Sequence, residues 1–140
     1  MARYESDNIF AKILRGEIPN HTVYENEDTL VFMDVMPMSR GHCLVVPKAE
    51  SRNLLDADPA IFGKVMKVVQ KVANAANTAL NADGVVIQQF NEEPAGQTVF
   101  HLHFHVVPVY AGVALARHAD RMADNGELAA LAKKIAGALR

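Results

Sequence analysis

A single long amphipathic segment lies near the middle of this sequence, between residues 58 and 84. Its apolar residues recur every three or four positions, as on one side of an α-helix, and lysines occupy the opposite side. The apolar residues are Ile61, Val65, Val68, Val72 and Leu80, and the lysines are Lys64, Lys67 and Lys71. No other helix interrupts the expected strands, so a fold of repeated βαβ units is excluded. The order predicts an α+β fold, with an antiparallel sheet of about five strands, one long helix and shorter terminal helices.

Shorter periodic runs and turn residues place the other elements. The strands are expected over residues 22–25, 29–35, 42–47, 85–90 and 100–109. A short helix is expected over residues 8–15 with Asp7 as its N-cap, and another over residues 127–139. We expect residues 1–140 to form one domain, in which residues 110–140 are a variable C-terminal tail that ends in a helix.

The charge, the cysteine content and the hydropathy limit the partners, the covalent cross-links and the location that the chain can have. A formal net charge of −2 gives no basic surface for a nucleic-acid backbone or an anionic membrane. Cys43 is the sole cysteine, so no intramolecular disulfide can form, and no apolar run approaches the roughly 20 residues that span a bilayer. Since the first residues also lack a secretory signal, we expect a cytoplasmic protein without nucleic-acid or membrane partners.

Three of the six histidines, His101, His103 and His105, alternate with apolar residues. Alternate residues of a strand point to one face, so the three imidazoles are expected to form a row while Leu102 and Phe104 pack behind them. Histidines without a joint role are the simplest interpretation of such residues. Three on one face beside a glycine-bearing loop make that interpretation the less favoured one.

A metal site is one functional interpretation of the row, and it is the weaker one. The outer two histidines would lie about 13 Å apart at about 3.3 Å per residue, so a single ion could bind only two of the three. The third ligand of that ion would have to come from another part of the chain, and the sequence contains no CxxC or HExxH motif that supplies it.

Nucleophilic catalysis is the favoured interpretation. A neutral imidazole is both a nucleophile and a proton carrier near pH 7, because its unperturbed pKa is about 6.5. Neighbouring rings can orient the attacking one, hydrogen-bond phosphate oxygens and protonate a leaving group. The row therefore favours displacement at phosphorus in two steps, through an imidazole–phosphorus bond.

These residues also resemble a known family. The stretch His101-Leu102-His103-Phe104-His105-Val106-Val107 is similar to the motif of the histidine-triad (HIT) family, in which histidines alternate with apolar residues. The preceding Asn91, Gly96, Gln97 and Thr98 match the lead-in of that motif in spacing. Further matching segments, in the order of the family, are residues 8–13, 16–19, 32–35 and 41–48. The resemblance runs from about residue 6 to residue 109 and is closest to the Hint-like branch.

The resemblance implies a dimeric α+β protein that binds purine nucleotides and cleaves at the α-phosphorus through a nucleotidylated histidine. It implies that His103 is the nucleophile, that His105 binds phosphate oxygens, and that His101 and His42 orient the site. The implied phosphate-binding loop comprises Asn91, Gly96, Gln97 and Thr98. The implied nucleoside pocket comprises the ribose-binding Asp34 and, around the base, Ile9, Phe10, Ile13, Phe32 and Val35.

Two departures from the family pattern bear on metal and substrate. Some bacterial members bind structural zinc through two cysteines, a later histidine and the first histidine of the motif. Here Asn8, Ala11 and Glu50 stand at the first three positions, so we expect no metal and no cofactor. The tail after Val109 does not resemble that of the phosphoramidase members, and the family's tail helps to select the leaving group.

The expected activity is hydrolysis of purine nucleoside 5′-phosphoramidates or related nucleotide conjugates, as a phosphoramidase-like enzyme. Hydrolysis of dinucleoside polyphosphates is the alternative within the enzyme class. A nucleotide-binding or scaffolding module with incidental activity is the alternative outside it.

A homodimer is expected through the long helix and the neighbouring strand, by the resemblance and because pairing covers an exposed strand edge. Small residues on the helix would let a second helix approach closely, unless they face solvent or the chain's own sheet. These residues are Ala73, Ala75, Ala76 and Ala79.

Overall fold

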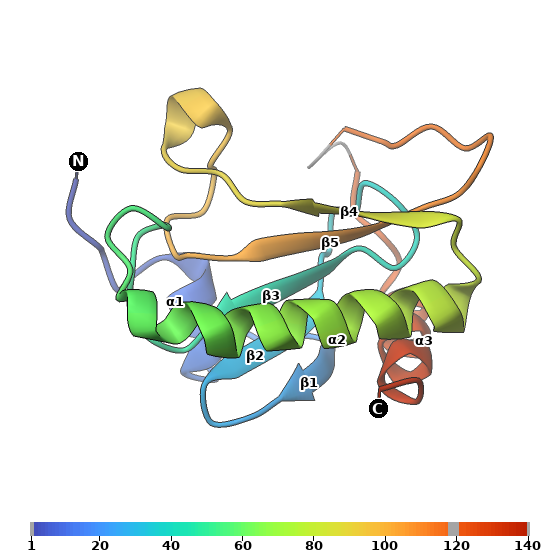
Figure 1. The fold of residues 1–140 in the computed structure, drawn as a ribbon, viewed down its shortest axis with the longest axis horizontal. Coiled ribbons are helices and arrows are strands. Elements are labelled where there is room, and N and C mark those ends of the chain that lie inside the picture. Colours follow the sequence, from blue (N-terminus) through green and yellow to red (C-terminus); the bar gives the residue numbers. More distant parts are fainter. Residues whose placement is uncertain (1, 118–120, 140) are drawn as a thin grey trace.

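One antiparallel sheet lies at the centre of the computed structural model, which describes residues 2–117 and 121–139 (Figure 1). Within these residues five strands follow the order β1-β2-β3-β5-β4, and every neighbouring pair is antiparallel. The strands are β1 (Thr22–Glu25), β2 (Thr29–Met33), β3 (Cys43–Pro47), β4 (Gly84–Gln88) and β5 (Phe104–Val109). The α+β prediction is confirmed. Residues 118–120 and 140 of the expected tail lie outside the described residues.

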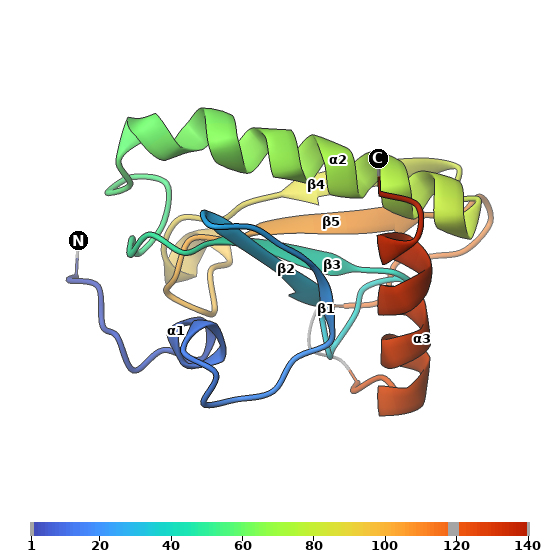
Figure 2. The same cartoon turned by 90° about the horizontal axis from the view of Figure 1, so that it is seen from below.

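Helices lie on both faces of the sheet (Figure 2). The long helix α2 (Phe62–Leu80) crosses one face, and the short helix α1 (Ile9–Leu14) lies on the other. The C-terminal helix α3 (Asn125–Ala136) packs against α2 and β1. Two 3₁₀ turns, η1 (Pro59–Ile61) and η2 (Glu93–Ala95), precede α2 and follow β4. Within the described residues no helix combines the length and apolar character that crossing a membrane requires.

The alternation of side chains along the strands divides the buried residues into two clusters. In β2, Val31 and Met33 pack with α2, whereas Leu30 and Phe32 pack with α1 on the opposite face. The same alternation holds in β5, where Phe104 and Val106 join the α2 cluster. His105 therefore points to the α1 face, where its partner in the ladder is Leu44 of β3.

Two alanines of α2 belong to the chain's own core. Ala75 and Ala76 are only 2% and 0% exposed and pack in the cluster that also contains Ala132 of α3. Their small size lets α3 and the sheet approach α2 closely. The expectation that these two alanines face a second copy is wrong, because their own chain already covers them.

The last strand begins four residues later than expected, at Phe104 instead of residue 100. In the ladder between β3 and β5, Val45 and Phe104 are the last pair in the direction of Pro47. Beyond it lies Pro47, which has no N–H to donate to a ladder. The N–H of Leu102 instead donates to the carbonyl of Ser51 at 3.0 Å. His101 and His103 thus precede the strand, and only His105 belongs to it.

Smaller differences at other boundaries have local causes. The N-cap of α1 is Asn8, not Asp7, because its Oδ1 accepts the N–H of Ala11. β2 ends at Met33, since the Oδ1 of Asp34 accepts the N–H of Met36 and turns the chain. The fourth strand lies within about two residues of its expected position, which is ordinary for strand ends. The C-terminal helix begins two residues earlier and ends three residues earlier than expected.

Candidate active site

A cavity of about 320 Å³ lies on the α1 face of the sheet, between α1, β2 and the segment that leads into β5. His103 and His105 both line it. So do all six residues expected to hold the nucleoside, namely Ile9, Phe10, Ile13, Phe32, Asp34 and Val35. The wall includes further residues that were not among the expected site residues, namely Ile18, Pro19, Asn20, Met33, Met36, Leu44 and Val99. The cavity is mostly apolar, and its polar side chains come from a few positions, as in small-ligand sites generally.

The orientation of the His103 ring is fixed by the backbone next to it. Its Nδ1 donates to the carbonyl oxygen of His101 at 2.6 Å, since a carbonyl can only accept. The proton of the neutral ring therefore sits on Nδ1 and the lone pair on Nε2. The edge of the ring also meets Phe10, with ring centroids 4.8 Å apart. His103 is thus a buried imidazole with a defined tautomer, whose lone pair is on Nε2.

A second chain of contacts fixes His42 and His105. The N–H of Met38 donates to Nδ1 of His42 at 3.0 Å, so the proton of His42 sits on Nε2. That Nε2 donates to Nδ1 of His105 at 2.9 Å. The neutral ring of His105 consequently carries its own proton on Nε2. Because the centroid of this ring lies 5.0 Å from that of His103, the site combines an imidazole lone pair with an imidazole N–H donor.

Asp34 completes the polar side of the cavity. Its Oδ1 accepts the N–H of Met36 at 2.8 Å, and its Oδ2 lies 3.4 Å from Nε2 of His42. Asp34 is 5% exposed. These contacts hold the carboxylate at the wall of the cavity, where it can accept hydrogen bonds from a ligand.

His101 takes a different position from the other two histidines of the motif. Its Nε2 donates to the carbonyl of Pro47 at 2.7 Å, and its Nδ1 lies 2.7 Å from the hydroxyl of Tyr4. Burial lowers the pKa of His101, although the bond to Pro47 opposes the shift. The ring is not part of the cavity wall. The expected row of three imidazoles on one strand face is therefore wrong, because residues 101–103 do not continue the strand.

The loop before the motif is held by its own side chains. Gln97 is 2% exposed and uses all four hydrogen-bonding positions of its amide. It accepts from the N–H of Glu92 and from Asn53, and it donates to the carbonyls of Arg52 and Val99. This arrangement favours a role in holding the loop over direct contact with a phosphate.

The other three loop residues of the expected site occupy different places. Oδ1 of Asn91 accepts the N–H of Leu54 and an N–H of Gln89, which ties the loop to the segment before α2. Gly96 has φ of +106°, a conformation that suits glycine. Thr98 is exposed and lines the cavity, so it is the one member of this loop set that the structure places in the cavity wall.

An ion pair that the sequence did not indicate stabilises the same loop. Nε and Nη2 of Arg52 donate to the two carboxylate oxygens of Glu92 at 2.8 and 3.0 Å. The hydrogen bond from Arg52 lowers the pKa of Glu92. Asn53 adds a bond of 2.6 Å to Glu92. The partners lie about 40 residues apart in the sequence, so no local pattern predicts this network.

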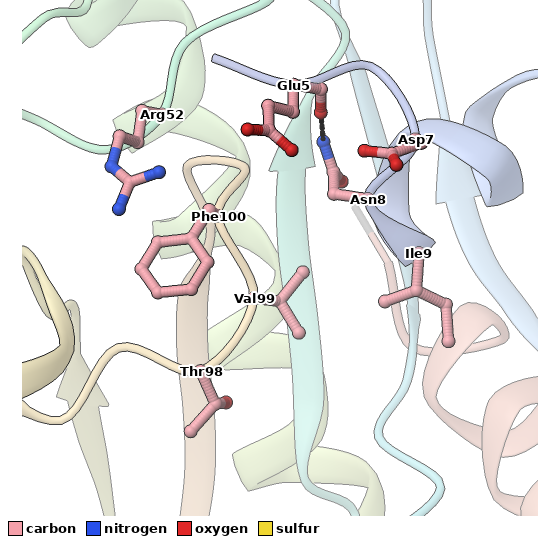
Figure 3. A pocket seen from close by; sticks show the side chains of 8 residues that line it. All are labelled: Glu5, Asp7, Asn8, Ile9, Arg52, Thr98, Val99 and Phe100. Atoms are coloured by element: carbon pink, nitrogen blue, oxygen red, sulfur yellow. Dashed lines mark hydrogen bonds between the residues drawn. The ribbon is translucent and has the colours of Figure 1, made fainter. Parts of the chain in front are cut away.

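A second hollow, of about 400 Å³, adjoins the cavity (Figure 3). It shares Ile9, Thr98 and Val99 with the cavity wall. Figure 3 shows the guanidinium of Arg52 on one side of it and Glu5 and Asp7 on the other. Its remaining wall residues are Asn8 and Phe100. The two hollows together offer room for a ligand with more than one part.

The residues do not fit the zinc site of some bacterial relatives. Both ring nitrogens of His101 already bond to Tyr4 and Pro47, and Oδ1 of Asn8 caps α1. Ala11 has no metal ligand to offer.

A different trio, Asp34, His42 and His105, has potential ligand atoms within 4.8 Å of one another. However, the proton on Nε2 of His42 occupies the position that an ion would need. The bond from Met38 to Nδ1 keeps that proton in place. The trio is therefore better described as a hydrogen-bonded chain than as a metal centre.

Comparisons with known proteins show that the chain is similar to one family over most of its length. The model of the HIT domain matches residues 15–112. A HIT-like protein of Bartonella henselae described as involved in cell-cycle regulation is 48% identical, with a TM-score of 0.92 over 98% of this chain and 100% of its own.

Two further relatives carry descriptions that concern ligands or substrates. A zinc-bound histidine-triad protein of Mycobacterium smegmatis is 34% identical, with a TM-score of 0.84 over 94% of this chain and 92% of its own. Adenylylsulfatase HINT3 of Arabidopsis thaliana is 32% identical over 84% of this chain and 63% of its own length.

The extent of these matches and the contacts around His103 lead to one assignment. The chain belongs to the HIT family of nucleotide hydrolases and transferases.

Proposed function

We propose that this protein hydrolyses purine nucleoside 5′-phosphoramidates or related nucleotide conjugates, through a nucleotidyl intermediate on Nε2 of His103. The observation that carries the proposal is the 2.6 Å bond from Nδ1 of His103 to the carbonyl of His101. This bond puts the lone pair on Nε2. It also stabilises the positive charge that the ring acquires when Nε2 bonds to phosphorus.

The proposed reaction has two steps. In the first, Nε2 of His103 attacks the α-phosphorus and the bond to the leaving group breaks, with the leaving amine taking up a proton from the solvent. In the second, water attacks the phosphorus and loses a proton to the solvent, which releases the mononucleotide and restores the neutral ring. The N–H on Nε2 of His105 and the hydroxyl of Thr98 are the proposed donors to the phosphate oxygens. His101 and His42 act by holding the other two rings.

The cavity supports a nucleoside as the recognised part. Its apolar wall, with Ile9, Phe10 and Phe32, is proposed to enclose a purine base, and Asp34 to accept hydrogen bonds from the ribose hydroxyls. The adjoining hollow supports a conjugate rather than a mononucleotide as the substrate. A group attached to the phosphorus would extend past Thr98 into it. Chemistry within this set of side chains needs no metal ion.

A sulfate conjugate of adenylate is a second candidate, favoured by the likeness to an adenylylsulfatase. Dinucleoside polyphosphates are the third, and a binding or scaffolding role without turnover is the non-enzymatic alternative. A substrate panel separates the enzymatic candidates. It would contain adenosine and guanosine 5′-phosphoramidates, adenosine 5′-phosphosulfate, diadenosine polyphosphates and nucleotide sugars, compared by kcat/KM.

The decisive variant for the mechanism is His103→Ala. We expect turnover to fall by several orders of magnitude, because the covalent route is lost, while the mononucleotide still binds in calorimetry. Rapid acid quenching of the wild type should trap a nucleotidyl group on the His103 peptide in mass spectrometry. His21→Ala, which changes a histidine outside the cavity, is the control. Turnover of His103→Ala within about tenfold of the wild type would contradict the mechanism.

We further propose a homodimer that forms through the edge strand β4 and the adjacent side of α2. Ile87 on β4 is 41% exposed and Met66 on α2 is 44% exposed, so this region offers apolar surface next to a strand edge that has no partner within the described residues. We also propose a cytoplasmic location.

A further inference from the structure

The side chain of Tyr4 makes a contact that spans almost the whole chain. Its hydroxyl lies 2.7 Å from Nδ1 of His101, which is 97 residues away in the sequence. The two rings meet edge to face, with centroids 5.5 Å apart and an angle of 67° between their planes. Since Nε2 of His101 already donates to Pro47, the neutral ring accepts at Nδ1 and the hydroxyl of Tyr4 donates. The contact thus satisfies the second nitrogen of a ring that is 0% exposed.

The position of His101 matters because the segment that contains it lacks strand pairing. β5 begins only at Phe104, and the bond from Leu102 to Ser51 is the backbone bond that anchors residues 101–103. The two hydrogen bonds of the His101 ring therefore help to hold this segment in place, as backbone hydrogen bonds between strands do elsewhere in the sheet. They also hold the carbonyl of His101, which accepts the N–H of the proposed nucleophile His103.

These contacts form a continuous path from the N-terminal segment to the reacting atom. The path runs from the hydroxyl of Tyr4 to the ring of His101, from its backbone carbonyl to Nδ1 of His103, and so to Nε2 of that ring. We propose that Tyr4 is a positioning residue for catalysis, which fixes His101 and through it the orientation and tautomer of His103. This inference rests on the proposed function of His103, but its effect on the tautomer can be measured without any substrate.

Tyr4→Phe is the sharpest test, because it removes the hydroxyl and keeps the ring that packs against His101. We expect kcat for adenosine 5′-phosphoramidate to fall about tenfold, the scale of one lost neutral hydrogen bond. KM should stay unchanged, since Tyr4 is not part of the cavity wall. Tyr24→Phe is the matched control: its hydroxyl accepts from Asn26 and its ring faces Lys71, outside the cavity wall.

Nitrogen NMR of the ligand-free protein provides the readout that does not depend on turnover. In the wild type and in Tyr24→Phe, the ring-nitrogen shifts should show His103 in a single tautomer with its proton on Nδ1. In Tyr4→Phe they should show a mixture of the two tautomers, and the Nδ1 signal of His101 should move toward that of a nitrogen without a donor.

The outcomes separate this inference from the proposed function. If the wild type hydrolyses no nucleotide conjugate, the proposed function is wrong. Even then, unchanged His103 signals in Tyr4→Phe would show that Tyr4 does not position His103. If the wild type is active, a kcat of Tyr4→Phe within about twofold of it overturns the inference. So does a lowered kcat with unchanged His103 signals, because Tyr4 would then act by another route.

Discussion

Replacing Gln97 with methionine tests whether this residue holds the loop or touches the substrate. The two side chains have similar length, so the change removes hydrogen bonds with little change in shape. The N–H of Glu92 and the carbonyls of Arg52 and Val99 lose their partner. These groups are partly buried, so each lost hydrogen bond lowers the stability by about 1 kcal/mol. The free energy of unfolding should therefore fall by about 3 kcal/mol. In a chain of this length that corresponds to a melting temperature lower by about 10 °C.

The assay is urea unfolding followed by circular dichroism, together with steady-state kinetics on the same samples. Gln70→Met is the control, since Gln70 is exposed on α2, and its unfolding free energy should stay within about 0.5 kcal/mol of the wild type. A Gln97→Met protein that unfolds like the wild type but has a raised KM would refute the reasoning. The amide would then contact the nucleotide directly, as the family resemblance implied.

Two further predictions concern metal and assembly. Dialysis against EDTA should leave both the rate of hydrolysis and the melting temperature unchanged, because the hydrogen bond from the N–H of Met38 keeps a proton on Nε2 of His42. Stoichiometric zinc in elemental analysis, with activity lost on chelation, would contradict this. Sedimentation at micromolar concentration should give about twice the chain mass of 15.3 kDa, and Ile87→Lys on β4 should weaken association where Leu55→Lys does not; a monomeric wild type would rule out the dimer.

The sequence predicted those elements whose periodicity is local. The apolar spacing of α2 and the alternation of Phe104, His105 and Val106 in β5 are properties of neighbouring residues, and the structure confirms both. The residues proposed from the family motif at the nucleoside pocket come together around His103 and His105. The predictions that were wrong concern features that depend on residues distant in the sequence. The start of β5 is set by Pro47 on another strand, and the environment of Ala76 is set by α3.

Parts of the site that carry no local signal were also missed. Tyr4 resembles any tyrosine near a chain end until its contact with His101 is seen. The pairing of Arg52 with Glu92 connects two loops, neither of which has helical or strand periodicity. Gln97 was recognised as important by its position in the motif, but only the structure shows that its whole amide is used within the loop.

The place of β5 in the sheet has a consequence for the nascent chain. β5 is the last strand in the part of the chain that the structure describes, yet it lies between β3 and β4. Until it leaves the ribosome, β3 has one edge without a partner, although every residue of β3 is buried in the finished protein. Such an apolar edge can pair with other chains, so synthesis passes through an interval in which aggregation competes with folding. Slowing translation between residues 47 and 104 should lengthen that interval and increase the yield of insoluble protein.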